Sequence, residues 1–141
     1  MSNLPRSASD LNVFGRDYLP GFLGLEIVSA EDGRIHARMP IRAEHLAPNG
    51  FLHAASVIAL ADTACGYGTI IRLPHGAESF TTIELKSNFL GTSRSGAIAC
   101  EATRVHGGRS TQVWDATVKD ESNGRVIALF RCTQMILYQK A

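Results

Sequence analysis

One acidic residue, Asp62, interrupts a stretch of the chain that is otherwise mostly apolar. Alanine, valine, isoleucine and leucine dominate residues 53–73, a pattern that predicts a helix buried on most sides. The neighbours of Asp62 on its helical stripe are all small: Ala55, Ala59, Gly66 and Thr69. A carboxylate in such surroundings loses hydration, which raises its pKa and makes it a candidate general base or nucleophile. A mid-helix aspartate can equally bond a neighbouring loop or face solvent, and the local pattern leaves both interpretations open.

The start of this expected helix offers backbone N–H groups to a ligand. A Pro-Asn-Gly run at residues 48–50 is a strong turn signal, and His53 stands just before the helix. The first helical turn carries unpaired N–H groups and the positive end of the helix dipole, which can stabilise a developing oxyanion. The side chains of Ala54 and Ala55 are small enough for a carbonyl oxygen to approach their amides. His53 itself also fits a helix N-cap or a structural histidine.

A second candidate for ligand binding is the run His106, Gly107, Gly108 and Arg109. It lies between two expected strands, so its glycines predict a tight turn with accessible backbone N–H groups. Such groups beside an arginine suit a phosphate. A plain hairpin turn with a solvated arginine explains the same residues.

Composition disfavours several classes of protein. The 141 residues carry a formal net charge of +1, and the 14 basic residues are scattered, which disfavours a nucleic-acid partner. Three cysteines without a CxxC pair disfavour a disulfide framework or a structural zinc site, and no clustered ligand set points to another metal. No apolar run approaches the roughly 20 residues needed to span a bilayer, so we expect a soluble cytoplasmic protein without a membrane partner.

The remaining patterns predict mostly strands. A short helix is expected over residues 9–18, capped by Ser9 or Asp10 and ended by Pro20 and Gly21. Strands joined by a hairpin turn are expected at residues 23–30 and 34–40. Four more strands follow the long helix, at residues 79–89, 96–105, 110–119 and 125–138.

This order of elements predicts an α+β fold in which a curved antiparallel meander wraps around one long central helix. Residues 79–89 alternate regularly, which would place Phe80, Thr82, Glu84, Lys86 and Asn88 on one face. A single helix covers only part of one sheet face, so we expect a homodimer or homotetramer.

The segment Asn49 to Ala55, NGFLHAA, followed by LADTA at residues 60–64, resembles the signature of a known family. It is similar to hot-dog-fold acyl-CoA thioesterases of the phenylacetate-pathway type, in the 4-hydroxybenzoyl-CoA thioesterase-like superfamily. That signature has a Gly, two residues and His-Gly-Gly, with the Asp of Leu-Ala-Asp nine residues after the His. Here Gly50 leads to His53, and Asp62 follows nine residues later. The resemblance implies one hot-dog domain over residues 1–141.

The resemblance also implies roles for individual residues. Asp62 matches the carboxylate that activates water or attacks the thioester, and Ala54 matches the glycine whose N–H polarises the thioester carbonyl. His53 matches the signature histidine that supports the loop. Thr82 matches a hydroxyl residue that the neighbouring subunit contributes to hold the water. Contacts with substrate or coenzyme A are implied for Phe89, Leu90, Arg94, His106, Gly107, Gly108 and Arg109.

Two departures from the family pattern concern the same loop. Ala54 and Ala55 replace the usual Gly-Gly, which keeps the amides but tightens the roof of the pocket. The polar Asn or Gln that the family carries three residues before its Gly is Ala47 here, so the nearby Asn49 is the candidate substitute.

The expected activity is hydrolysis of an acyl-CoA without a metal or a cofactor, with coenzyme A present only as part of the substrate. An apolar pocket near Phe51, Ile58, Cys65 and Phe89 would accept aromatic and medium aliphatic acyl groups equally. One alternative is an acyl-CoA-binding hot-dog protein without hydrolase activity. Another is a hot-dog dehydratase or hydratase, whose motif the nine-residue spacing of His and Asp does not match well. A small β-barrel binding protein would leave Asp62 without a role.

Overall fold

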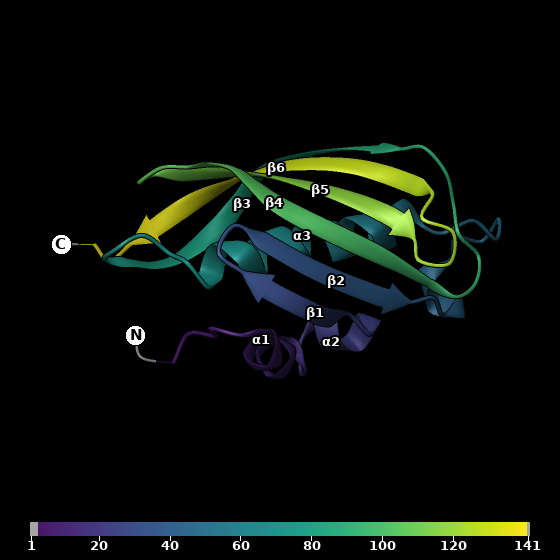
Figure 1. The fold of residues 1–141 in the computed structure, drawn as a ribbon, viewed down its shortest axis with the longest axis horizontal. Coiled ribbons are helices and arrows are strands. Elements are labelled where there is room, and N and C mark those ends of the chain that lie inside the picture. The colour runs from purple at the N-terminus through teal and green to yellow at the C-terminus, as the bar shows by residue number, and fades with distance from the viewer. Residues whose placement is uncertain (1–2, 141) are drawn as a thin grey trace.

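Six antiparallel strands and one long helix make up most of the molecule, as the computed structural model, which describes residues 3–140, shows (Figure 1). The helices are α1 (Ala8–Gly15), α2 (Leu19–Leu23) and α3 (Ala54–Ile70), with a 3-10 turn at Ala43–His45. The strands are β1 (Glu26–Glu31), β2 (Arg34–Pro40), β3 (Ala77–Phe89), β4 (Ala97–Gly107), β5 (Thr111–Asp120) and β6 (Val126–Tyr138). Within the described residues, no helix has both the length and the apolar character to cross a bilayer.

The strand order differs from the predicted meander. The sheet runs β1-β2-β4-β5-β6-β3, so β3 pairs with β6 at one edge although β4 follows it in the chain. After β2, helix α3 carries the chain to the far edge of the sheet, where β3 lies. The chain then returns, so that β4 pairs with β2. The two free edges of the sheet are therefore β1 and β3. The predicted α+β class and the curved sheet around one helix are confirmed.

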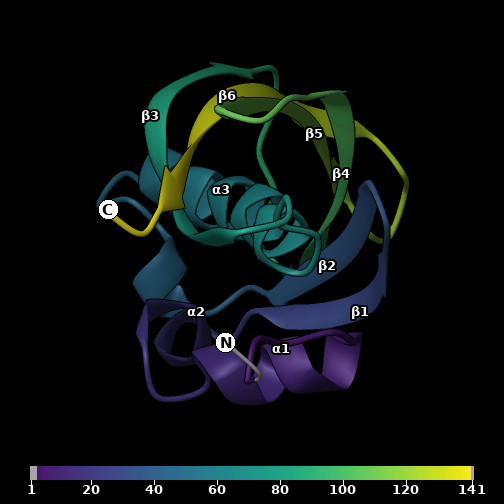
Figure 2. The same cartoon turned by 90° about the vertical axis from the view of Figure 1, so that its left-hand side faces the viewer.

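The concave face of the sheet wraps around α3 (Figure 2), and two glycines of this helix bring it very close to the strands. A Cβ atom on Gly68 would lie 2.3 Å from the Trp114 ring, and one on Gly66 would lie 2.8 Å from the Phe80 ring. Trp114 has no exposed surface. Gly66 on the stripe of Asp62 and the nearby Gly68 thus leave room for aromatic side chains of the sheet, and the N-terminal half of the stripe remains accessible.

A bulge interrupts the predicted alternation of β3. The pairing with β6 shifts register between Thr82 and Glu84. Beyond this point Leu85 pairs with Cys132, an inward residue of β6. Since paired residues share a face, the inward face of β3 changes from the even to the odd positions at the bulge: Leu85, Ser87 and Phe89 point inward, and Glu84, Lys86 and Asn88 do not.

The N-terminal segment forms two helices where the sequence predicted one. The side chain of Ser7, not of Ser9 or Asp10, caps α1. Pro20 does not end a helix but stands in the first turn of α2, where its missing N–H costs nothing. Gly24, at φ +80, ends α2 in the left-handed conformation that glycine favours. The expected strand over residues 23–30 therefore begins only at β1.

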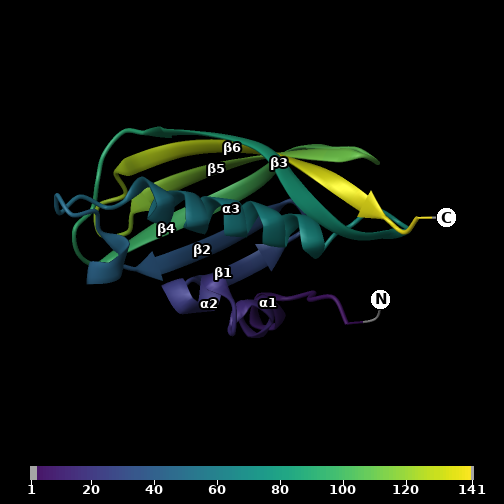
Figure 3. The ribbon, with the colours of Figure 1, turned by 180° about the vertical axis from the view of Figure 1, so that it is seen from behind.

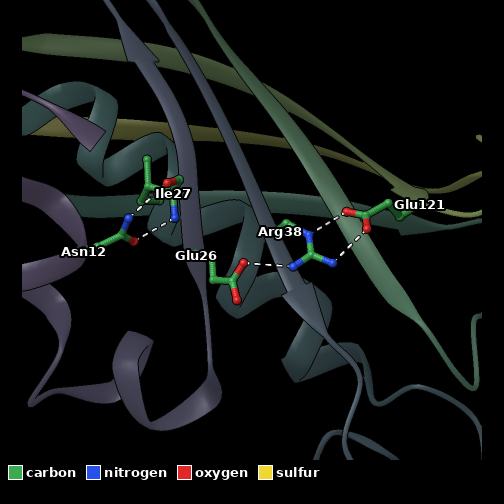
Figure 4. A network of polar contacts seen from close by, with 5 residues as sticks. All are labelled: Asn12, Glu26, Ile27, Arg38 and Glu121. Atoms are coloured by element: carbon green, nitrogen blue, oxygen red, sulfur yellow. Dashed lines mark hydrogen bonds and ion pairs between the residues drawn. The ribbon is translucent and has the colours of Figure 1, made fainter. Parts of the chain in front are cut away.

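Side-chain contacts hold the β1 edge in place (Figure 4). The amide of Asn12 on α1 donates to the carbonyl of Ile27 at 3.0 Å and accepts from its N–H at 2.8 Å, as a neighbouring strand would. Arg38 on β2 donates to both carboxylate oxygens of Glu121 and to Glu26, each at 2.8 Å. Helix α1 thus covers the edge of β1 and leaves β3 as the open edge.

We predict that Gly68→Ala destabilises the protein, because the buried Trp114 ring must move to admit a methyl group. The expected loss is about 1–3 kcal/mol of unfolding free energy, measured by chemical denaturation. Ala59→Gly, in the open half of the same helix, is the control and should cost about 1 kcal/mol from helix propensity alone. An unchanged stability of Gly68→Ala would show that the helix does not pack as closely as described.

Candidate active site

Two histidines shape the loop that leads into α3. His45 is fully buried. Its Nδ1 accepts from the N–H of Arg42 at 3.0 Å, and its Nε2 lies 2.8 Å from the carbonyl oxygen of Leu23. Because Nδ1 accepts a hydrogen bond, Nε2 carries the proton and donates. The carbonyl of His45 in turn accepts from the N–H of His53, at 3.0 Å. This chain of bonds fixes the point at which α3 begins.

His53 is the N-cap of α3, and its ring accepts from the second backbone N–H of the helix rather than from the first. Its Nδ1 accepts from the N–H of Ala55 at 2.9 Å, and its carbonyl accepts from Ser56. The N–H of Ala54, the first residue of the helix, has no acceptor within the part of the chain that the structure describes. Ala54 is exposed, so this N–H at the positive end of the helix dipole can reach a ligand oxygen.

Asp62 lies half-buried on α3, on the side that faces β3. Burial raises the pKa of its carboxyl group above the usual value, and a hydrogen bond from Thr82 opposes the shift. Thr82 Oγ1 lies 3.2 Å from Asp62 Oδ1. The resemblance implied that the hydroxyl would come from a neighbouring subunit, but the bond forms within one chain. A carboxylate with a raised pKa and one hydroxyl donor suits a general base.

Gln134 is a further partner of this pair that was not predicted from the sequence. Gln134 on β6 has no exposed surface, and its Oε1 lies 2.6 Å from Thr82 Oγ1. Its Nε2 is buried without a partner among the described residues. The signal was present in the sequence, because Gln134 occupies an inward position of a strand between the apolar residues Cys132 and Ile136.

The side chain of Asn49 bonds within its own turn and not to Asp62. Its Oδ1 accepts from the N–H of Phe51 at 3.1 Å, which closes the turn before α3. The side chain of Arg94 lies 4.7 Å above the ring of Phe51, and Thr92 Oγ1 accepts from the N–H of Leu52 at 3.0 Å. The predicted contact region at residues 90–94 thus lies beside the start of α3, where Leu90 is 60% exposed.

The second predicted contact region lies at the other end of the molecule (Figure 1). His106 and Gly107 end β4, and Gly108 bonds back to Thr111 at 2.9 Å in the turn. Both glycines and Arg109 line a cleft of about 620 Å³ beyond the C-terminal end of α3. The other residues of the cleft are Asp32, Arg72, Pro74, Arg104 and Gln112. Since α3 has 17 residues, about 25 Å separates this turn from Ala54.

Helix α3 is left uncovered on the side where the sheet ends at β3 (Figure 3), and Asp62 is partly exposed. Phe89, which points inward, is 45% exposed, and Leu85 is 39% exposed. Asp62 lines none of the five prominent clefts of the described residues. Cys65 is fully buried, so it does not line an open acyl pocket as expected, whereas Phe51, Ile58 and Phe89 remain accessible.

These features supply a carboxyl group whose pKa is raised and, separately, a backbone N–H that can bind an oxyanion. That pair of functions is what the hydrolysis of an ester or thioester requires.

Comparisons with known proteins agree with this chemistry. Residues 49–127 match the family model described as Thioesterase superfamily. A 1,4-dihydroxy-2-naphthoyl-CoA hydrolase of Listeria monocytogenes is 30% identical over 111 residues, which cover 79% of this chain and 89% of the relative.

Two solved structures share the fold. A mutant of the thioesterase PA1618 from Pseudomonas aeruginosa superposes with a TM-score of 0.86 at 25% identity, covering 92% of this chain and 93% of that one. The thioesterase HI1161 from Haemophilus influenzae gives a TM-score of 0.86 at 26% identity, covering 96% of this chain and 94% of that one. The predicted hot-dog fold and the predicted family resemblance are confirmed.

We predict that Asp62→Asn stabilises the protein at neutral pH. Because burial raises the folded-state pKa of Asp62, its contribution to stability is fully present below the unfolded-state pKa and is lost as the pH rises through the folded-state pKa. The melting temperature of Asp62→Asn should therefore exceed that of the wild type at pH 7–8, with a gap that narrows on acidification. Calorimetric scans from pH 4 to pH 8 measure this gap. Asp115→Asn, at an exposed ion pair with Arg131, is the control and should show no such trend. A gap that widens in acid would mean that the carboxylate is stabilised by the fold.

Proposed function

Because the chain belongs to the thioesterase superfamily and is a thioester hydrolase, we propose that it hydrolyses an acyl-CoA with Asp62 as the catalytic carboxylate. The observation that supports this most strongly is the half-buried carboxyl group, whose pKa is raised by burial and which Thr82 contacts at 3.2 Å. In this proposal, the products are the free acid and coenzyme A, and coenzyme A takes part only as a portion of the substrate.

The chemistry follows from two groups acting on one thioester. The N–H of Ala54 binds the carbonyl oxygen and stabilises the negative charge that develops on it. Asp62 removes a proton from water as the water attacks the carbonyl carbon, or attacks that carbon itself to give an anhydride that water then cleaves. The C–S bond breaks in the collapse of the tetrahedral intermediate, and the thiolate of coenzyme A leaves.

The spacing of these two groups along α3 favours a site shared between two chains. Ala54 and Asp62 are eight residues apart on a continuous helix, which is about 12 Å along its axis. The attacking water must lie within about 3–3.5 Å of the carbonyl carbon, and the carbonyl oxygen is bonded to that same carbon, so the groups that hold the water and the oxygen must lie close together. We therefore propose that Ala54 of one protomer and Asp62 of a second protomer serve the same thioester.

The open edge of the sheet suggests how two copies meet. Strand β3 ends the sheet with unpaired backbone groups, and exposed side chains lie along it, including Ile83, which is 52% exposed. Antiparallel pairing of β3 with β3 of a second copy by a twofold axis would place the two α3 helices in opposite directions. The turn around Arg109 of one copy would then lie near the start of α3 of the other, which would unite the two predicted coenzyme A contact regions.

The acyl group would enter beside the accessible apolar side chains Phe51, Ile58 and Phe89. The Listeria relative is named for an aromatic acyl-CoA, 1,4-dihydroxy-2-naphthoyl-CoA, so aromatic acyl groups are included in the proposed range together with medium aliphatic ones.

We predict that Asp62→Ala lowers the turnover of every acyl-CoA that the wild type hydrolyses by at least about 100-fold, the low end for loss of a general base. Release of free thiol is followed with a panel of aromatic and aliphatic acyl-CoAs. Asp10→Ala, at a carboxylate on exposed α1, is the control and should keep wild-type turnover. Near-normal hydrolysis by Asp62→Ala would exclude Asp62 as the catalytic group.

A complementation experiment tests the shared site. Ala54→Pro removes only the N–H at the first helical position, where proline is tolerated, and should lower turnover by about 10²–10³-fold. Asp62→Ala and Ala54→Pro chains are unfolded together and refolded as a mixture. In mixed dimers one of the two sites keeps both groups, so random pairing should restore about a quarter of wild-type turnover. A mixture as inactive as its two components would place both groups in one chain.

A further inference from the structure

A row of polar side chains crosses the sheet beneath α3, at positions where the neighbouring inward residues are apolar. Thr82 on β3 pairs with Gln134 on β6, and Gln134 pairs with Gln112 on β5. Gln134 is fully buried and Gln112 is 2% exposed. Gln112 accepts from the indole N–H of Trp114 at 2.8 Å. The row ends at Asp62, which Thr82 contacts.

The hydrogen bonds of Thr82 conflict as long as the Gln134 amide oxygen faces it. Thr82 Oγ1 lies 2.6 Å from Gln134 Oε1 and 3.2 Å from Asp62 Oδ1. Both of these oxygens are acceptors when Asp62 is ionised, but a hydroxyl group has only one proton to donate. At the same time Gln134 Nε2 is buried without an acceptor among the described residues, which is a costly arrangement.

A half-turn of the amide removes the conflict, because the two ends of a carboxamide have nearly the same shape. Nε2 then donates to Thr82 Oγ1, and the hydroxyl proton of Thr82 is directed to the carboxylate of Asp62. Thr82 then takes part in two hydrogen bonds, one with Gln134 and one with Asp62, whereas its single proton could serve only one of the two acceptors before.

We propose that Gln134 is a positioning residue for Asp62: its amide nitrogen donates to Thr82, so that Thr82 donates to the ionised carboxylate. This inference rests on the proposed function of Asp62 as a base. When Asp62 takes a proton from water, the direction of the hydrogen bonds along this row can reverse. The carboxyl O–H then donates to Thr82, and the hydroxyl of Thr82 donates to Oε1 after the amide turns back, so Thr82 has both a donor and an acceptor in either protonation state of the base.

The other titratable groups around this row are thiols. Cys65 lies one turn further along α3 and shares a hydrogen bond with Cys132 of β6; this bond, burial and the charge of Asp62 raise the pKa of Cys65. Cys100 of β4 is fully buried as well, and burial raises the pKa of its thiol to about 12. Cys65 and Cys100 are therefore neutral at physiological pH, which leaves the Thr82–Gln134 pair as the polar support of Asp62.

The test is the titration of Asp62 itself, followed by NMR of protein with 13C-labelled aspartate carboxyl groups and assigned with Asp62→Asn. In Gln134→Met, which keeps the volume but has no amide, we expect the pKa of Asp62 to rise, because the hydroxyl of Thr82 is no longer polarised by an N–H donor and donates less strongly to the carboxylate. Gln112→Met is the matched control, since it removes a buried glutamine of the same row that does not bond Thr82, and it should leave the titration unchanged. Thr82→Val should raise the pKa further, and Thr82→Ser should restore it.

The sign of the change decides the proposal. If the amide oxygen of Gln134 faced Thr82, its loss would free the hydroxyl proton for Asp62 and lower the pKa of the carboxyl group. A lower or an unchanged pKa in Gln134→Met would thus overturn the proposal, and Gln134→Leu gives the same readout if the methionine variant does not fold.

Turnover provides a second measurement. A higher pKa should reduce kcat/KM roughly threefold on the acid limb for each half pH unit by which that limb moves, with little change on the alkaline plateau. Since the NMR titration does not depend on hydrolysis, a protein that hydrolyses no acyl-CoA would refute the proposed function and still report on Gln134.

Discussion

The partial burial of one carboxyl group on α3 is the constraint on which the site depends. Desolvation raises the pKa of Asp62, so the folded protein holds a carboxyl group that is costly to ionise. The cost is tolerable because Thr82 supplies a hydrogen bond and because the helix surface next to Asp62 is open on one side. Full burial would keep the carboxyl group neutral, and full exposure would give it the pKa of an ordinary surface aspartate.

The depth of Asp62 is set by how α3 packs along its length. In the C-terminal half, Gly66 and Gly68 allow Phe80 and Trp114 to press against the helix backbone. In the N-terminal half, Ala54 and Ala55 remain exposed. Asp62 lies between the closed and the open halves. The same helix therefore provides the rigid support, the carboxyl group and the open amide, and its continuous course keeps the last two about 12 Å apart along the axis.

Much of this was predictable from sequence periodicity and composition. The apolar run around Asp62 predicted α3, and the turn signals predicted all six strands, to within three residues at each end. Local sequence patterns did not predict the structure where the same residues are compatible with several conformations. Pro20 fits the first turn of a helix as well as a helix end, and the bulge near Ile83 leaves no mark in an alternating strand. The cytoplasmic location and the oligomeric state stay predictions.

The sequence by itself determined that an acidic side chain would lie in a helix of small apolar residues, nine positions after a histidine at its N-cap. This follows from spacing, because helix geometry relates neighbours in the chain to neighbours on a face. Only the tertiary structure decided which residues meet Asp62. Thr82 and Gln134 lie 20 and 72 positions further along the chain, and they reach it because β3 pairs with β6 rather than with β4. Strand pairing depends on the packing of the whole sheet around α3, and no local pattern in the chain encodes that choice.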